Sequence, residues 1–206
     1  GRNFESFSED PYWTISMAIP YINGVQREGI GTSLKHFAVN NQEHERMTIS
    51  AEVDERTLRE VYLSTFEQVI KEANPWTVMG AYNKLNGTHA CENRRLLTTI
   101  LREEWGYEGV VVSDWGAVHS GVFTVRAGCN IEMPGPGKFL TEGLRQAIET
   151  GDLTETEIDA LVKPVLELYR KCATGTGGRE ANTAAHQTLS RRVAEEGMVL
   201  LKNDNQ

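Results

Sequence analysis

The chain has few cysteines and no long apolar run, and each absence excludes a class of protein. Its 206 residues include only three cysteines. They lie far apart and form no C-x-x-C pair, so the pattern does not indicate a zinc or redox site. No apolar stretch approaches the roughly 18–20 residues of a membrane span, and we expect no membrane partner. The five histidines show no recognised metal-ligand spacing.

An excess of basic charge is also missing. Acidic residues outnumber basic ones by 29 to 21, and the net charge is −8. Without a basic stripe interleaved with aromatic residues, we expect no nucleic-acid partner. The sequence shows no basic segment followed by an apolar one, which is the pattern of a signal peptide. The lack of this pattern favours a cytoplasmic location. Secreted and periplasmic locations stay open, because Gly1 is not an initiator methionine.

Short apolar segments alternate with helical patterns over the first two thirds of the chain. This alternation predicts βα units and a parallel sheet. We predict strands over Thr32–Val39, Trp76–Tyr82, Gly109–Ser113 and Cys129–Met133. We predict helices near Pro11–Arg27, Asp54–Ala73, Asn93–Trp105 and Ala117–Ala127.

The pattern changes after Met133. Helices are expected over Phe139–Thr150 and Glu155–Cys172, and Pro164 should kink or break the second. Residues 173–178 are rich in glycine and threonine and are predicted to be a linker. A last helix is expected over Ala184–Glu196, followed by an apolar run that opens a further element. Residues 1–172 are therefore predicted to belong to one domain, and residues 173–206 to be a linker and the start of the domain that follows.

About four βα units are expected, whereas a closed (β/α)₈ barrel needs eight. Two α/β architectures fit this count. One is a doubly wound sheet, and the other is a piece of a larger barrel.

Asp114 is the strongest candidate for a catalytic group. It ends the apolar run that begins at Val110 and is followed by Trp115 and Gly116. The carboxyl ends of parallel strands are where α/β proteins build their sites. The alternative is that Asp114 caps the next helix, since aspartate is a favoured N-cap.

The other predicted strands also end in polar or aromatic residues suited to a sugar. Sugar hydroxyls need charged and amide hydrogen-bond partners, and the CH face of the ring needs an aromatic wall. The candidate set is Arg2, Lys35, His36, Tyr82, Asp114 and Trp115. Each residue alone also fits an ordinary ion pair or a packing role. Glu43 and Arg46 are most simply read as a surface pair.

Four segments carry a specific resemblance. They are GRNFESFSEDP from Gly1, KHFAVNNQE from Lys35, MGAYNKLNG from Met79 and VSDWGA from Val112. Together and in this order they resemble glycoside hydrolase family 3, most closely its bacterial β-glucosidases. The resemblance implies the C-terminal half of a (β/α)₈ TIM-type barrel with parallel strands, followed by helices and a linker to an α/β sandwich domain.

The resemblance also implies roles for single residues. Asp114 is the implied nucleophile, and no cofactor or metal is implied. The implied sugar-binding residues are Arg2, Lys35, His36, Met79, Tyr82 and Trp115. The family's acid/base glutamate lies in its second domain. At Asn130 the family carries an aspartate, a departure that we read as structural.

We therefore predict retaining hydrolysis of terminal β-D-glucosyl residues from β-glucosides and cello-oligosaccharides, through a covalent intermediate on Asp114. The expected partner is a small carbohydrate, and these residues alone are expected to be inactive. Two alternatives are a β-xylosidase or other β-glycosidase of the same family, and a non-catalytic carbohydrate-binding fragment.

Overall fold

The computed structural model of the chain describes residues 3–174 and 180–204. The chain forms two compact units, residues 1–175 and 176–206. Most of the predicted linker lies outside the described residues, so the domain boundary stays a prediction. No helix in the described ranges is long and apolar enough to cross a membrane.

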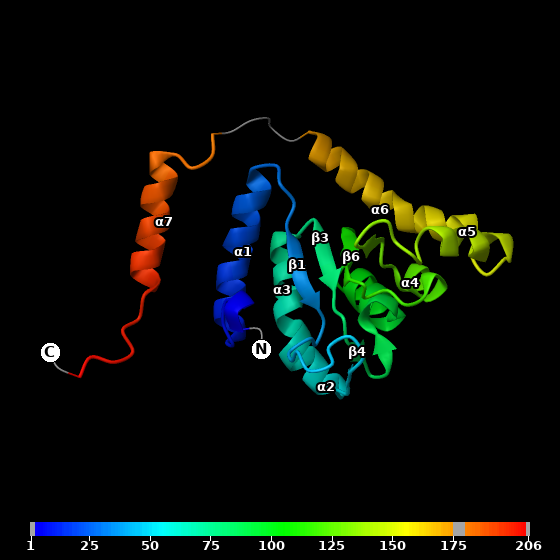
Figure 1. The fold of residues 1–206 in the computed structure, drawn as a ribbon, viewed down its shortest axis with the longest axis horizontal. Coiled ribbons are helices and arrows are strands. Elements are labelled where there is room, and N and C mark those ends of the chain that lie inside the picture. The colour runs from blue at the N-terminus through cyan, green and yellow to red at the C-terminus, as the bar shows by residue number, and fades with distance from the viewer. Residues whose placement is uncertain (1–2, 175–179, 205–206) are drawn as a thin grey trace. The chain divides into compact units, whose positions relative to one another are not determined.

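A four-stranded parallel sheet forms the centre of the first unit, with the order β1-β3-β6-β7 (Figure 1). All four predicted strands are confirmed. Their observed bounds are β1 Ser33–Phe37, β3 Thr77–Gly80, β6 Val110–Trp115 and β7 Ile131–Met133. Because all four strands run the same way, their carboxyl ends meet at one edge of the sheet.

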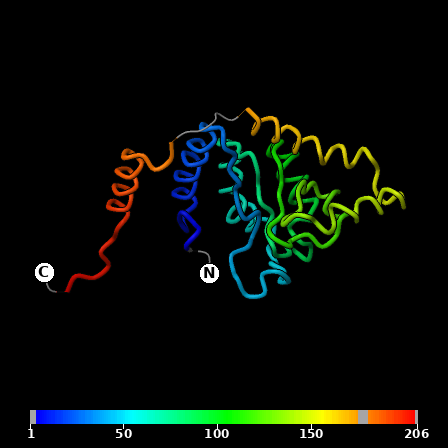
Figure 2. The backbone as a smooth tube through the Cα atoms, turned by 45° about the horizontal axis from the view of Figure 1, so that its top comes forward, coloured from blue at the N-terminus to red at the C-terminus, as the bar shows by residue number. Residues whose placement is uncertain are grey.

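Helices connect these strands, as the alternation predicted (Figure 2). Before β3 they are α1 Pro11–Arg27, α2 Glu55–Thr57, η2 Leu58–Leu63 and α3 Ser64–Ala73. After it come η4 Arg95–Glu104, α4 Gly121–Ala127, α5 Glu142–Glu149 and α6 Glu155–Ala173. Asp10 caps α1 by accepting hydrogen bonds from the N–H groups of Tyr12 and Trp13. The second unit contains α7, Ala184–Gly197.

A small second sheet was not predicted. Its order is β2-β4-β5, and each strand is two residues long, too short to show periodicity. The strands are β2 Ser50–Ala51, β4 Lys84–Leu85 and β5 Thr88–His89, and the short helices η1 Asn3–Glu5 and η3 Ala90–Glu92 complete the unit. Asn86 and Gly87 turn the β4–β5 hairpin with positive φ angles of 49° and 85°. Asn-Gly is the strongest short signal for such a turn.

Two helix predictions were wrong in detail. The helix after β6 begins at Gly121 rather than Ala117, because Ser120 caps it and accepts a hydrogen bond from Phe123 N–H. Helix α6 runs through Pro164 without a break. A capping box of Thr154 and Glu157 starts α6, and buried Leu161 packs it onto the unit.

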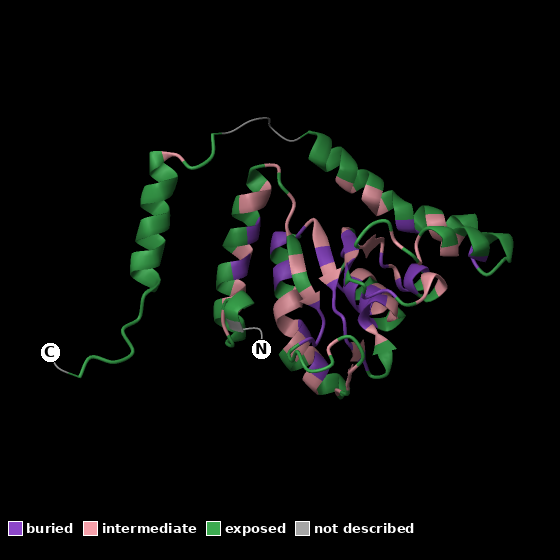
Figure 3. Cartoon of the chain, viewed as in Figure 1, coloured by how far each residue is buried: buried purple, intermediate pink, exposed green. Residues whose placement is uncertain are grey.

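The core lies between the sheet and its helices (Figure 3). From the sheet, Val78 and Val111 are fully buried. From η4, Leu97 and Leu101 are fully buried against them. Burial of this apolar face accounts for the helical pattern of the segment.

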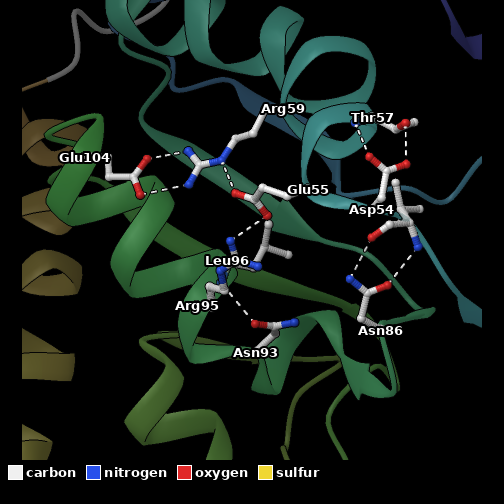
Figure 4. Close-up of polar contacts among 10 residues, drawn as sticks. Asp54, Glu55, Thr57, Arg59, Asn86, Asn93, Arg95, Leu96 and Glu104 are labelled. Atoms are coloured by element: carbon white, nitrogen blue, oxygen red, sulfur yellow. Dashed lines mark hydrogen bonds and ion pairs between the residues drawn. The ribbon is translucent and has the colours of Figure 1, made fainter.

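Ion pairs on the surface connect α2 and η2 to η4 (Figure 4). Arg59 donates to both Glu55 and Glu104, and Arg95 lies 2.5 Å from Glu55. Hydrogen bonds from these arginines hold the pKa values of both carboxyls below their usual range. Such exposed pairs are each worth about 0.2–1 kcal/mol, so they support the helix packing rather than create it.

Asn130 has a structural role, as we expected. Its Oδ1 accepts hydrogen bonds from Val111 N–H at 2.8 Å and from Arg102 Nη2 at 2.9 Å. Its Nδ2 donates to Leu161 O at 2.7 Å. One amide thereby joins β6, η4 and α6, which uses both its donor and its acceptor. An aspartate in this position lacks the donor that Leu161 receives.

Leu97 should therefore be central to stability. Leu97→Ala is expected to lower the free energy of unfolding by about 2–5 kcal/mol, because a fully buried side chain leaves a cavity. Leu166→Ala on α6 is the control, since Leu166 is 53% exposed. Urea denaturation measures both variants. Equal midpoints for the two would contradict this account of the core.

Candidate active site

Asp114 lies at the carboxyl end of β6, where the sequence predicted it. Val110 and Val111 of this strand are fully buried, while Asp114 keeps 7% exposure. Its Oδ1 accepts a hydrogen bond from Trp115 N–H at 2.8 Å. Its Oδ2 lies 3.5 Å from His36 Nε2. The alternative role as a helix cap is wrong, because Ser120 caps α4.

The backbone around Asp114 is held from both sides. Ser113 Oγ donates to Asp114 O and accepts from Met133 N–H on β7. Gly116 N–H donates to Met133 O at 2.8 Å, and Gly116 has a φ of +78°, which favours glycine. The chain therefore turns sharply after Trp115 and leaves the carboxylate at the edge of the sheet.

His36 reaches Asp114 from β1. The next residue, Phe37, is fully buried and packs edge-on against Phe66 and Trp105, with ring centroids 5.2 and 5.8 Å away. This aromatic anchor fixes the end of β1 in the core. His36 thus stands at a defined place beside the carboxylate.

Tyr82 follows β3 and completes the group around Asp114. Burial raises the pKa of its phenol, and the hydrogen bond and charge of Asp114 raise it further. The phenol therefore stays protonated near neutral pH and can donate a hydrogen bond to the carboxylate. His36, Tyr82 and Asp114 are the predicted residues that the fold brings together.

Arg46 belongs to the same group, although we had read Glu43 and Arg46 as a surface pair. The ion pair is present at 2.7 Å, but the Arg46 guanidinium also lies 4.7 Å from the centre of the Tyr82 ring. Its charge lowers the pKa of Tyr82, against the effect of Asp114. The sequence signal for this role is the position of Arg46 in the loop after β1, since loops at the carboxyl ends of strands carry functional residues.

The remaining predicted residues are placed differently. Lys35 Nζ lies 3.1 Å from Glu5 Oε2 of η1. Met79 is half-buried on β3, and its Cα pairs with Val112. Trp115 is 50% exposed, as an aromatic wall for a ligand needs to be. Arg2 lies outside the described residues.

Glu132 on β7 holds the loop that follows it. Its carboxylate accepts hydrogen bonds from the N–H groups of Lys138, Phe139 and Leu140. These three hydrogen bonds give Glu132 a structural role, because they fix the backbone of this loop. Within the described residues, no group of three or more His, Cys, Asp or Glu is arranged to hold a metal ion.

Comparisons with known proteins show the family to which this chain belongs. The family described as "Glycosyl hydrolase family 3 N terminal domain" matches residues 1–168. The chain is 47% identical over 206 residues to thermostable beta-glucosidase B of Acetivibrio thermocellus, covering 100% of this chain and 27% of that protein. It is 42% identical over 207 residues to an exo-alpha-(1->6)-L-arabinopyranosidase of Bifidobacterium breve, covering 100% of this chain and 27% of that protein.

Solved structures give the same result. Beta-glucosidase 3B from Thermotoga neapolitana, in complex with alpha-D-glucose, superposes with a TM-score of 0.92 at 39% identity. The match covers 100% of this chain and 30% of that chain. The fold is therefore that of part of a TIM-type barrel, and the chain spans about a quarter to a third of the length of the relatives it matches.

Removing the charge of Asp114 and removing the charge of Arg46 should shift the pKa of the Tyr82 phenol in opposite directions. Asp114→Asn should lower the pKa of Tyr82, because the carboxylate's charge raises it, and Arg46→Leu should raise that pKa. The pKa is measured by spectrophotometric titration of the unmodified protein and of each variant. Subtracting the titration of the same protein with the added substitution Tyr82→Phe leaves the signal of Tyr82. A shift of the same sign in both variants would show that the phenol does not lie between the two charges.

Proposed function

Because this chain belongs to the glycosyl hydrolase family 3 N-terminal domain, we propose that it carries the nucleophile of a retaining β-glucosidase. The substrates are β-glucosides and cello-oligosaccharides, from which terminal β-D-glucosyl residues are removed. One observation carries the proposal. Asp114 is anchored through Oδ1 by Trp115 N–H, while its Oδ2 faces His36 at the carboxyl edge of the sheet.

This geometry supports nucleophilic catalysis. In the proposed reaction Asp114 Oδ2 attacks the anomeric carbon, the aglycone leaves with a proton from a general acid, and water then hydrolyses the glycosyl ester. The Trp115 N–H holds the carboxylate in one orientation, and Tyr82 remains a neutral hydrogen-bond donor beside it. Holding a nucleophile in its reactive orientation supplies much of the rate enhancement of covalent catalysis.

The sugar is proposed to rest among Arg2, Lys35, His36, Met79, Tyr82 and Trp115. Arg46 joins this set, because its guanidinium stacks on Tyr82. The cationic and amphipathic side chains match ring hydroxyls, and exposed Trp115 offers an apolar wall. The ligand is a small carbohydrate, and neither a nucleic acid nor a membrane takes part.

The general acid is proposed to come from another part of the full-length protein. Retaining enzymes need a second carboxyl about 5–5.5 Å from the first. Here Glu43 is paired with Arg46, and Glu132 is engaged by three backbone N–H groups. This chain covers 27% of the Acetivibrio enzyme, which supports an acid supplied from outside these residues.

Substrate choice has one serious competitor. Two relatives at 42% identity act as exo-alpha-(1->6)-L-arabinopyranosidases by name. Parallel assays on nitrophenyl β-D-glucoside and nitrophenyl α-L-arabinopyranoside decide between the two sugars. We expect a higher kcat/KM for the glucoside, whereas a preference for the arabinoside would reassign the substrate.

Asp114→Asn in the full-length protein should lower kcat by several decades, because an amide cannot form the glycosyl ester. Added azide should restore turnover by replacing the lost nucleophile. Asp159→Asn, an exposed carboxylate on α6, is the control and should behave as the unmodified protein. Near-normal kcat in Asp114→Asn would refute the nucleophile assignment.

Residues 1–206 alone should show almost no hydrolysis of aryl β-glucosides. Without its general acid the site loses a factor of roughly 10²–10⁴ in rate. Turnover of a purified 206-residue chain is compared with that of the full-length protein under the same conditions. Equal rates would require an acid within these residues, and Glu43→Gln and Glu132→Gln would then identify it.

A further inference from the structure

The segments that carry Tyr82 and Asp114 meet in the candidate site, and a second contact also joins them. His89 on β5 and His119, which follows Asp114 in the chain, stack their imidazole rings. The ring centroids are 3.7 Å apart, and the planes differ by 17°. His119 is exposed, precedes α4, and packs on a second imidazole.

Glu92 on η3 secures this stack. Its Oε1 accepts a hydrogen bond from the backbone N–H of His119 at 2.8 Å and lies 3.9 Å from His119 Nδ1. The Glu92 side chain is only 10% exposed, so its charged hydrogen bond is poorly screened by water. Residues 116–120 have no helix or strand of their own, and their N–H groups depend on such individual partners.

His89 extends the contact to Tyr82. Its Nδ1 lies 3.4 Å from the backbone carbonyl of Tyr82. Burial, and then the neighbouring His119, lower the pKa of His89, so its ring is neutral near pH 7. In the neutral ring, only a protonated Nδ1 can donate to that carbonyl. Glu92 and Lys84 are the other charged groups that act on this imidazole.

These contacts run from the Tyr82 carbonyl through His89 and His119 to Glu92. His89 and Glu92 lie on the segment after Tyr82, whereas His119 lies on the segment after Asp114. We propose that Glu92 and the His89–His119 stack are positioning residues that hold Asp114 in register with Tyr82. The inference rests on the proposed function, because positioning has a catalytic consequence only if Asp114 is the nucleophile.

Substitution of Glu92 in the full-length protein tests the inference with two readouts. Glu92→Ala removes the acceptor for His119 N–H, so amide hydrogen exchange in residues 116–120 should rise. In the hydrolysis of nitrophenyl β-D-glucoside, kcat should fall about tenfold with KM within about twofold, since misplaced reacting groups slow the chemical step.

Matched variants separate positioning from a general loss of structure. Glu92→Gln keeps an oxygen acceptor and should restore both exchange and kcat. Glu103→Ala, an exposed carboxylate on η4, should leave both unchanged. His89→Phe keeps a ring against His119 but removes the donor to the Tyr82 carbonyl, and should lower kcat even if Glu92→Ala does not fold.

Two results would overturn the inference. One is unchanged exchange in residues 116–120 of Glu92→Ala. The other is a raised exchange with unchanged kcat, which removes the link to catalysis. Hydrogen exchange reports on the contact whether or not the protein is active. An unmodified protein that hydrolyses no β-glycoside would refute the proposed function, and with it the catalytic role assigned to this contact.

Discussion

The parallel pairing of β3 with β6 is the constraint on which the candidate site depends. Val78 pairs with Val111, and Gly80 pairs with Ser113. Tyr82 and Asp114 therefore leave the sheet at the same edge, although 32 positions separate them in the chain. Gly80 permits the close approach of Cys91 to β3, because a Cβ at this position would lie 2.6 Å from Cys91 Sγ.

Apolar packing fixes the strand ends at the carboxyl edge of the sheet. Val110 and Val111 of β6 are fully buried, and the ring of Phe37 packs the end of β1 against two aromatic neighbours. The polar contacts at the edge include one between strands, from Met133 N–H to Ser113 Oγ, and one between neighbours, from Trp115 N–H to Asp114 Oδ1. A strand end held by these contacts, with one carboxylate oxygen turned toward His36, suits a nucleophile, because little reorganisation is needed at the moment of attack.

The four strands and the principal helices were predictable because their apolar periodicities are long and regular. The position of Asp114 followed from the same pattern, since it directly ends a β-branched run. The β2-β4-β5 sheet was missed because two-residue strands carry no period. The loop contacts of Arg46, His89 and Glu92 were missed for another reason. They join residues distant in sequence through turns whose path depends on the folded sheet.

Pro164 and Ala117 show the limits of local signals. Proline removes one helical hydrogen bond, but the remaining turns of α6 and the packing of Leu161 keep the helix continuous. A helical pattern begins at Ala117, yet the Ser120 side chain accepts a hydrogen bond from Phe123 N–H and α4 starts later, at Gly121. In both cases a specific tertiary or capping contact outweighed the local preference.

The most direct test of the central claim is covalent trapping in the full-length protein. A 2-deoxy-2-fluoro-β-D-glucosyl fluoride slows hydrolysis of the intermediate more than its formation. Mass spectrometry of the digested protein should then find one glycosyl group on the peptide that contains Asp114, and none in Asp114→Asn. A label on another carboxylate, or no label in a protein that still hydrolyses β-glucosides, would contradict the account.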